Sequence, residues 1–126
     1  MPPIARLRAV VLDCPDPLAL AQFYAALVGG EVKPSTDDWA TLRDGDTVLL
    51  SFQGVEDYRA PDWPSADNPQ QMHIDVTIPA DGLAAAEQAV QAAGARRHDY
   101  QPGLDSGDTF VVYLDPVGHP FCLCWD

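Results

Sequence analysis

The stretch DPLALAQFYAALVGG, residues 16–30, sets the pattern by which the rest of the chain can be interpreted. Asp16 is a preferred helix N-cap, and Pro17 stands at the first helical position, where its missing N–H costs nothing. Gly29-Gly30 supplies the left-handed residue on which helices commonly end. Between them, apolar residues recur at helical spacing as one stripe: Leu20, Phe23, Tyr24, Leu27 and Val28. The sequence therefore predicts a helix from Pro17 to the residue before Gly29.

Short strand-like runs flank this helix. One precedes it, one follows it directly, and two more surround the turn Asp44-Gly45-Asp46, which has hairpin chemistry. The predicted strands of this half are residues 7–12, 31–33, 39–43 and 47–52.

The same order of elements returns later in the chain. A strand is predicted at 72–78, a helix from Leu83 to about Ala93, and further strands at 95–100, 109–114 and 120–125. Residues 102–108 are interpreted as a loop. Residues 115–118, Asp-Pro-Val-Gly, form a predicted turn in which proline presets the backbone and glycine takes a conformation that other residues avoid. His119, which follows this turn, is expected to be exposed.

The duplication decides the fold class. Val28-Gly29 recurs as Ala93-Gly94, and the strand that contains Ala9 recurs at His73, at spacings of 65 and 64 residues. Two copies of strand-helix-strand-strand-strand predict an α+β fold with two tandem βαβββ modules, whose curved mixed sheet surrounds a cavity. We expect a single domain over 1–126, with half one at about 5–54, a covering loop at 55–70 and half two at about 71–126.

Composition and charge exclude several classes of function. Seven Lys+Arg against 19 Asp+Glu give a formal net charge of −12, which disfavours binding to nucleic acid and to anionic membranes. No apolar run approaches the length that spans a bilayer, and the start of the chain does not resemble a signal peptide. The three cysteines include no CxxC pair, which suits reduced thiols. We therefore expect a soluble cytoplasmic protein that binds neither nucleic acid nor membranes.

Three motifs in order carry a resemblance to a known family. They are Asp16-Pro17-x5-Phe23-Tyr24-x4-Gly29-Gly30, then the strand QQMHIDV at 70–76, then Asp115-Pro116-x-Gly118-His119-Pro120-Phe121-Cys122-Leu123. Together they resemble the vicinal oxygen chelate superfamily (glyoxalase, bleomycin resistance protein and dioxygenase), and more narrowly its glyoxalase-like domain proteins. The resemblance covers essentially the whole chain. It implies the glyoxalase/bleomycin-resistance fold and, as in many relatives, a homodimer.

The resemblance also implies a place for a metal, which this chain does not fill. In the superfamily's metalloenzymes four inward-facing strand positions supply the ligands, two from each half. Here they map to Ala9, Leu49 (Ser51 if the register slips by two), His73 and Cys122. Alanine and leucine have no ligand atoms, and a divalent metal needs three or four. His73 with Cys122 makes a two-ligand site, so we expect no metal cofactor.

The function expected is that of a glyoxalase-like protein that binds a small organic ligand in the inter-sheet cavity without a catalytic metal. Two alternatives stay open: a metal-dependent lyase or dioxygenase of the superfamily with an atypical ligand set, and a non-catalytic structural module. The chemistry, if the protein is an enzyme, is then that of a glyoxalase-like lyase or dioxygenase.

Five residues are candidates for the ligand site. His73 is a cavity-lining donor or general base, or else a histidine satisfied by backbone groups; by strand alternation it points the same way as Asp75. Cys122 lines the same face and, without a nearby cation, is an inert thiol. Aromatic side chains provide a wall for an apolar ligand, and the aromatic candidates are Trp39, Phe52 and Trp63. Trp63, in the irregular loop, is interpreted as part of a lid, or else as a plug that covers the sheet edge.

Overall fold

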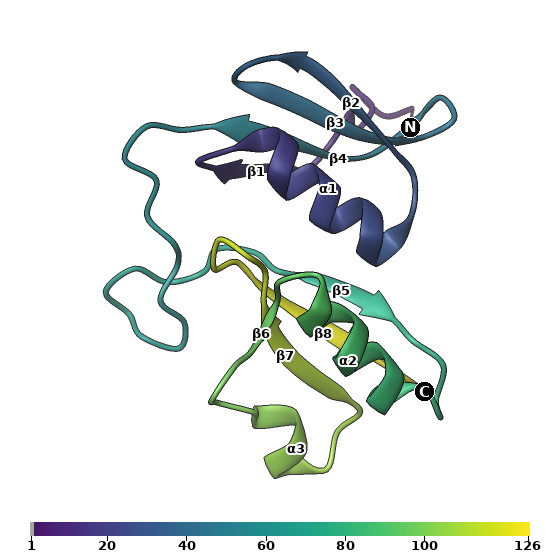
Figure 1. Ribbon diagram of the computed structural model, residues 1–126, viewed down its shortest axis with the longest axis vertical. Coiled ribbons are helices and arrows are strands. Elements are labelled where there is room, and N and C mark those ends of the chain that lie inside the picture. Colours follow the sequence, from purple (N-terminus) through teal and green to yellow (C-terminus); the bar gives the residue numbers. More distant parts are fainter. Residues whose placement is uncertain (1) are drawn as a thin grey trace. The chain divides into compact units, whose positions relative to one another are not determined.

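The computed structural model describes residues 2–126, and they divide into two compact units, with the boundary after Tyr58. The connection between the last strand of the first unit and the first strand of the second, residues 55–73, contains no helix or strand (Figure 1). These residues include 55–70, for which an ordered linker or a covering loop is the expectation from the sequence. Among the described residues, no helix has both the length and the apolar character needed to span a bilayer.

The first unit is a four-stranded mixed sheet with one helix. Its strand order is β1-β4-β3-β2, with β1 parallel to β4 and the other pairs antiparallel. The elements are β1 (Val11–Cys14), α1 (Pro17–Val28), β2 (Glu31–Thr36), β3 (Trp39–Asp44) and β4 (Thr47–Gly54).

Helix α1 forms as its sequence predicts. The Asp16 carboxylate accepts a hydrogen bond from the Ala19 backbone N–H (3.3 Å), and Gly29 at the other end has φ +81°, a conformation that favours glycine. The apolar stripe packs on the sheet, where the ring of Tyr24 stacks on Phe52 with centroids 5.8 Å apart. Both rings are fully buried, so the aromatic pair forms the centre of this core.

The second unit repeats the arrangement. Its sheet has the order β5-β8-β7-β6, with β5 parallel to β8, which is the order of the first sheet element for element. The elements are β5 (Ile74–Thr77), α2 (Leu83–Ala92), β6 (Arg96–Arg97), α3 (Pro102–Ser106), β7 (Phe110–Leu114) and β8 (Pro120–Cys124). The predicted α+β fold with two tandem βαβββ modules is thereby confirmed.

Three predicted elements were wrong in detail. The first strand begins at Val11 and not at residue 7, and the strand predicted at 95–100 covers only Arg96–Arg97. Residues 102–108, predicted to be a loop, contain the single helical turn α3. Pro102 stands at the start of that turn and Gly107, at φ +80°, ends it. A helix of one turn has too few apolar residues to show a period, so only these terminal residues indicated it.

The turn at residues 115–118 forms as predicted, but His119 does not lie exposed. The buried Asp115 carboxylate accepts hydrogen bonds from the backbone N–H groups of Val117 and His119, each at 3.0 Å. Its other oxygen lies 2.6 Å from His119 Nδ1, and the histidine side chain is 16% exposed. The carboxylate thus organises the hairpin that joins β7 to β8.

Candidate functional site

The second unit contains a pocket of about 270 Å³ beside the start of β5. The loop before β5, helix α3 and strands β7 and β8 all contribute to it. Its lining residues are Trp63, Gln70, His73, Pro102, Phe110, Val112, Pro120 and Cys122. Five of these eight are aromatic, aliphatic or proline side chains, so the pocket offers mostly apolar surface to an occupant.

Trp63 forms one wall, and its position is fixed by residues that follow β6. The His98 ring packs edge-on against the indole with centroids 5.1 Å apart, and the Tyr100 ring lies at 5.3 Å. His98 Nδ1 accepts a hydrogen bond from the Tyr100 backbone N–H (3.0 Å), so its proton is on Nε2, which donates to the Trp63 carbonyl at 2.8 Å. The loop that holds Trp63 is therefore attached to the sheet by both rings.

Three polar side chains meet at one edge of the pocket. His73 immediately precedes β5, and its Nε2 lies 3.2 Å from Oδ1 of Asp75, which points to the same face as alternation predicts. Cys122 lies directly opposite Asp75 in the β5–β8 pair. One nitrogen, one oxygen and one sulfur from these residues lie within 4.8 Å of one another. Asp75 thus adds a third possible ligand atom to the two counted from the sequence.

The thiols at this edge are poor nucleophiles. Burial, followed by the negative charge of Asp75, raises the pKa of Cys122 to about 12. The same causes raise the pKa of Cys124. A reactive cysteine requires a lowered pKa, so Cys122 stays a protonated thiol near neutral pH.

Gln70 provides an unsatisfied acceptor in the pocket. Its side chain lines the pocket, and its Oε1 is buried without a hydrogen-bond partner among the described residues. Buried polar atoms are nearly always paired, so such an atom beside a cavity calls for an explanation. The sequence analysis did not select Gln70, because burial of one amide oxygen depends on how the loop at 55–73 folds back onto the sheet.

The candidate residues fall into two groups. The pocket brings together Trp63, His73 and Cys122. Trp39, on β3, and Phe52, on β4, belong to the first unit, where Phe52 is stacked on Tyr24. The sequence analysis also missed four residues of the lining, Pro102, Phe110, Val112 and Pro120, since strand and helix positions become pocket walls only through tertiary packing.

The strand register shows which positions of the two halves correspond. Ser51 lies opposite Val11, and Cys122 lies opposite Asp75. Val11 and Asp75 are separated by 64 positions, the spacing that also relates Ala9 to His73. The register therefore makes Ser51, and not Leu49, the counterpart of Cys122.

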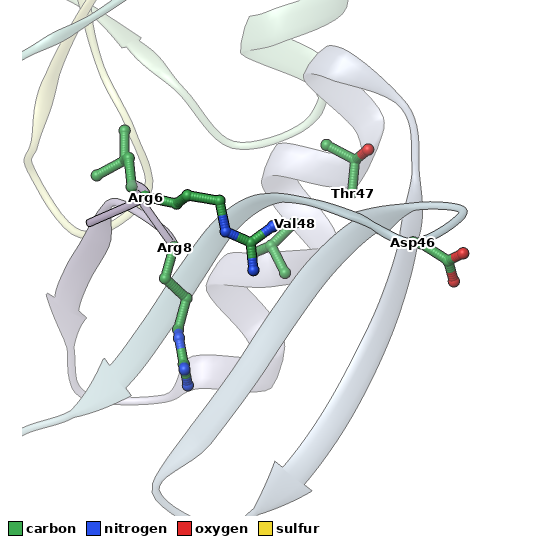
Figure 2. Close-up of a pocket in the computed structure, with 6 residues that line it drawn as sticks. Arg6, Arg8, Asp46, Thr47 and Val48 are labelled. Carbon is green, nitrogen blue, oxygen red and sulfur yellow. The ribbon is translucent and has the colours of Figure 1, made fainter. Parts of the chain in front are cut away.

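A wider hollow in the first unit does not form a convergent site. It has a volume of about 540 Å³ and is lined by Arg6, Leu7, Arg8, Asp46, Thr47 and Val48. Figure 2 shows that the side chains of Arg6 and Arg8 extend in different directions and that the Asp46 carboxylate points away from both. All three are exposed. A second hollow in this unit, of about 530 Å³, carries the acidic residues Asp38, Glu56 and Asp57.

Comparison with known proteins agrees with the fold. Residues 9–124 match the sequence model of a family described as glyoxalase-like domain. A glyoxalase/bleomycin resistance protein/dioxygenase family enzyme from Burkholderia phytofirmans has a TM-score of 0.70 at 15% identity, over 96% of this chain and 98% of that one. The fosfomycin resistance protein FosX of Listeria monocytogenes has a TM-score of 0.69 at 14% identity, over 98% and 94%.

A mutant of the Listeria protein, solved with Mn(II) and a dihydroxypropylphosphonic acid, has a TM-score of 0.66 at 14% identity, over 97% of this chain and 93% of that one. No curated protein matches this sequence.

Proposed function

This chain belongs to the glyoxalase-like domain family, and from that premise we propose that it binds a small organic molecule in the pocket of its second unit, without a catalytic metal. One observation carries the proposal: an apolar, partly aromatic pocket with His73, Gln70 and Cys122 as its polar groups. Pockets for small molecules typically combine predominantly apolar walls with a few placed polar groups.

The charges around the pocket favour an uncharged ligand. Its described lining includes no arginine or lysine, and Asp75 stands beside His73 at its edge. A phosphonate such as the one bound to the Listeria protein requires cationic side chains or a metal to balance its charge. We propose that this chain acts on a different class of compound.

The residues of the first half support the metal-free part of the proposal. Positions Ala9, Val11 and Ser51 correspond by register to His73, Asp75 and Cys122. None of the three offers the imidazole, thiolate or carboxylate groups that bind divalent transition metals in proteins. At these three positions, therefore, the first half contributes no such ligand to a metal.

The three-atom cluster in the second half favours one alternative function. His73, Asp75 and Cys122 together reach the three protein ligands of a catalytic zinc site, which leaves the fourth position open for water or substrate. Zinc bound there would act as a Lewis acid at the edge of the pocket, and the chain would then be a metal-dependent lyase with an atypical ligand set; the dioxygenase alternative would require a redox-active metal at the same three residues, because zinc has no redox chemistry.

Ligand binding is tested by thermal unfolding against a panel of uncharged small organic compounds, acyclic as well as cyclic. A compound that binds only the folded protein raises Tm by mass action. We expect Trp63→Ala, which removes a pocket wall, to abolish the rise. Trp125→Ala, a matched substitution outside the described lining, should retain it. If no compound raises Tm, or if both variants respond as the natural protein does, the proposal is wrong.

The metal question has its own measurement. We expect protein purified without chelators to contain no stoichiometric metal and EDTA to leave ligand affinity unchanged. Zinc function predicts the reverse, together with a thiolate-to-cobalt absorption band after Co²⁺ loading that disappears in Cys122→Ser. That result would replace the metal-free proposal with the zinc-dependent one.

A further inference from the structure

The atoms that line the pocket indicate which class of ligand it binds. This inference about the ligand class rests on the function proposed above. The decisive atom is Gln70 Oε1, the one buried side-chain oxygen or nitrogen in the described part of the chain that has no hydrogen-bond partner. Leaving such an acceptor unpaired is costly, whereas a ligand that donates to it would recover the lost hydrogen bond.

The shape of the pocket indicates what carries the donor. Trp63 and Phe110 provide aromatic surface, and Val112 and Pro102 provide aliphatic surface. Such a lining packs well against a flat ring. A dry apolar cavity of about 150 Å³ binds benzene. The volume of about 270 Å³ therefore leaves room for a fused two-ring molecule.

We propose that the ligand is a flat, uncharged ring compound with one N–H or O–H group, which donates a hydrogen bond to Gln70 Oε1. His98 and Tyr100 take part indirectly, because they hold Trp63 against the ligand. The described lining contains no lysine or arginine, so it offers no permanently charged cation to pair with a carboxylate or phosphate on the ring.

Two probes of the same shape isolate the hydrogen bond. Indole and benzofuran are both fused two-ring compounds, but only indole has a donor. Measured by calorimetry, indole should bind about fivefold to tenfold more tightly than benzofuran, the ratio expected for one neutral hydrogen bond. Gln70→Met keeps the volume and removes the acceptor, so the preference should disappear through weaker indole binding. Gln88→Met, the same exchange at an exposed position of α2, should keep it.

Each other outcome overturns the inference. Equal affinities, a preference for benzofuran, or a preference that survives Gln70→Met would show that Oε1 does not receive a donor from the ligand. If neither probe binds while other panel compounds raise Tm, the ligand class is wrong and the proposed function stands. If nothing binds, both are wrong. The Tm of unliganded Gln70→Met should equal or exceed that of the natural protein, since an unpaired buried oxygen has been removed, and a large fall in Tm would also contradict the inference.

Discussion

The two halves of the chain have the same strand order and register but different side chains on corresponding positions. In the first half these positions hold Ala9, Val11 and Ser51; in the second half they hold groups with acid-base and ligand chemistry, His73, Asp75 and Cys122. The difference shows that one strand order and register accommodates different side chains at these positions. In this chain the acid-base and ligand groups at the three positions belong to the second copy.

The helix-facing sides of the halves differ as well. Helix α1 buries Leu20, Phe23 and Tyr24 against its sheet, whereas α2 buries only Val90 among its residues. The aromatic core of the first half therefore includes helix residues, whereas the fully buried rings of the second half, Tyr113 and Phe121, come from its strands.

The largest effect is expected in that aromatic core. Phe52 is fully buried and stacked on Tyr24, so Phe52→Ala removes the ring and leaves a cavity. The free energy of unfolding should fall by about 3–5 kcal/mol, as measured by urea denaturation. Leu104→Ala, a truncation of an exposed side chain on α3, should change it by less than about 0.5 kcal/mol. A loss below about 1 kcal/mol for Phe52→Ala would contradict the assignment of Phe52 to the core.

A second prediction tests the three positions at which the side chains of the two halves differ. The triple substitution His73→Ala, Asp75→Val and Cys122→Ser gives the second half the residues of the first. Since His73 and Asp75 are exposed, the free energy of unfolding should change by less than about 2 kcal/mol, while affinity for a pocket ligand falls about tenfold. Calorimetry and urea denaturation measure the two effects separately. Retained affinity would mean that the polar edge has no part in binding.

Much of this architecture could be predicted because its determinants are local. The helix of the first half is specified by Asp16, Pro17 and Gly29, and the duplication follows from spacing alone. Trp63 was selected because it lies in a long irregular loop, whereas His73 and Cys122 were selected because the family resemblance maps two of the superfamily's ligand positions onto them. Contacts between distant segments could not be predicted in this way: His98 holds Trp63 from 35 positions away, and Gln70 Oε1 is notable only because the fold buries it.

The N-terminal ends of α1 and α2 also differ between the two halves, and here the expected effect on stability is smaller. In α1 the Asp16 carboxylate caps the helix, whereas Gly82 at the start of α2 makes no side-chain capping hydrogen bond. Asp16→Ala should therefore lower the free energy of unfolding by about 1 kcal/mol. Asp81→Ala, an exposed carboxylate just before α2, should change it by less than about 0.5 kcal/mol. Equal losses in the two variants, measured by thermal unfolding, would show that the carboxylates act through general charge and not through capping.

The smallest effect near neutral pH concerns a hydroxyl network in the second half. The Tyr113 hydroxyl donates to Glu87 Oε1 and accepts from Gln91 Nε2, each at 3.0 Å. Burial and then the hydrogen bond to Glu87 raise the pKa of Tyr113 from 10.0 to about 12. A raised pKa means that the folded state holds this proton more tightly than the unfolded state does, so the corresponding stabilisation is complete below about pH 10 and is lost as pH rises toward 12.

In Tyr113→Phe the fall in the free energy of unfolding between pH 9.5 and 11.5 should accordingly be shallower than in the natural protein, with little difference in slope between pH 7 and 9. Parallel curves through the alkaline range would contradict the raised pKa, and with it the conclusion that this hydroxyl network is formed and shielded from water on the helix-covered side of the second sheet.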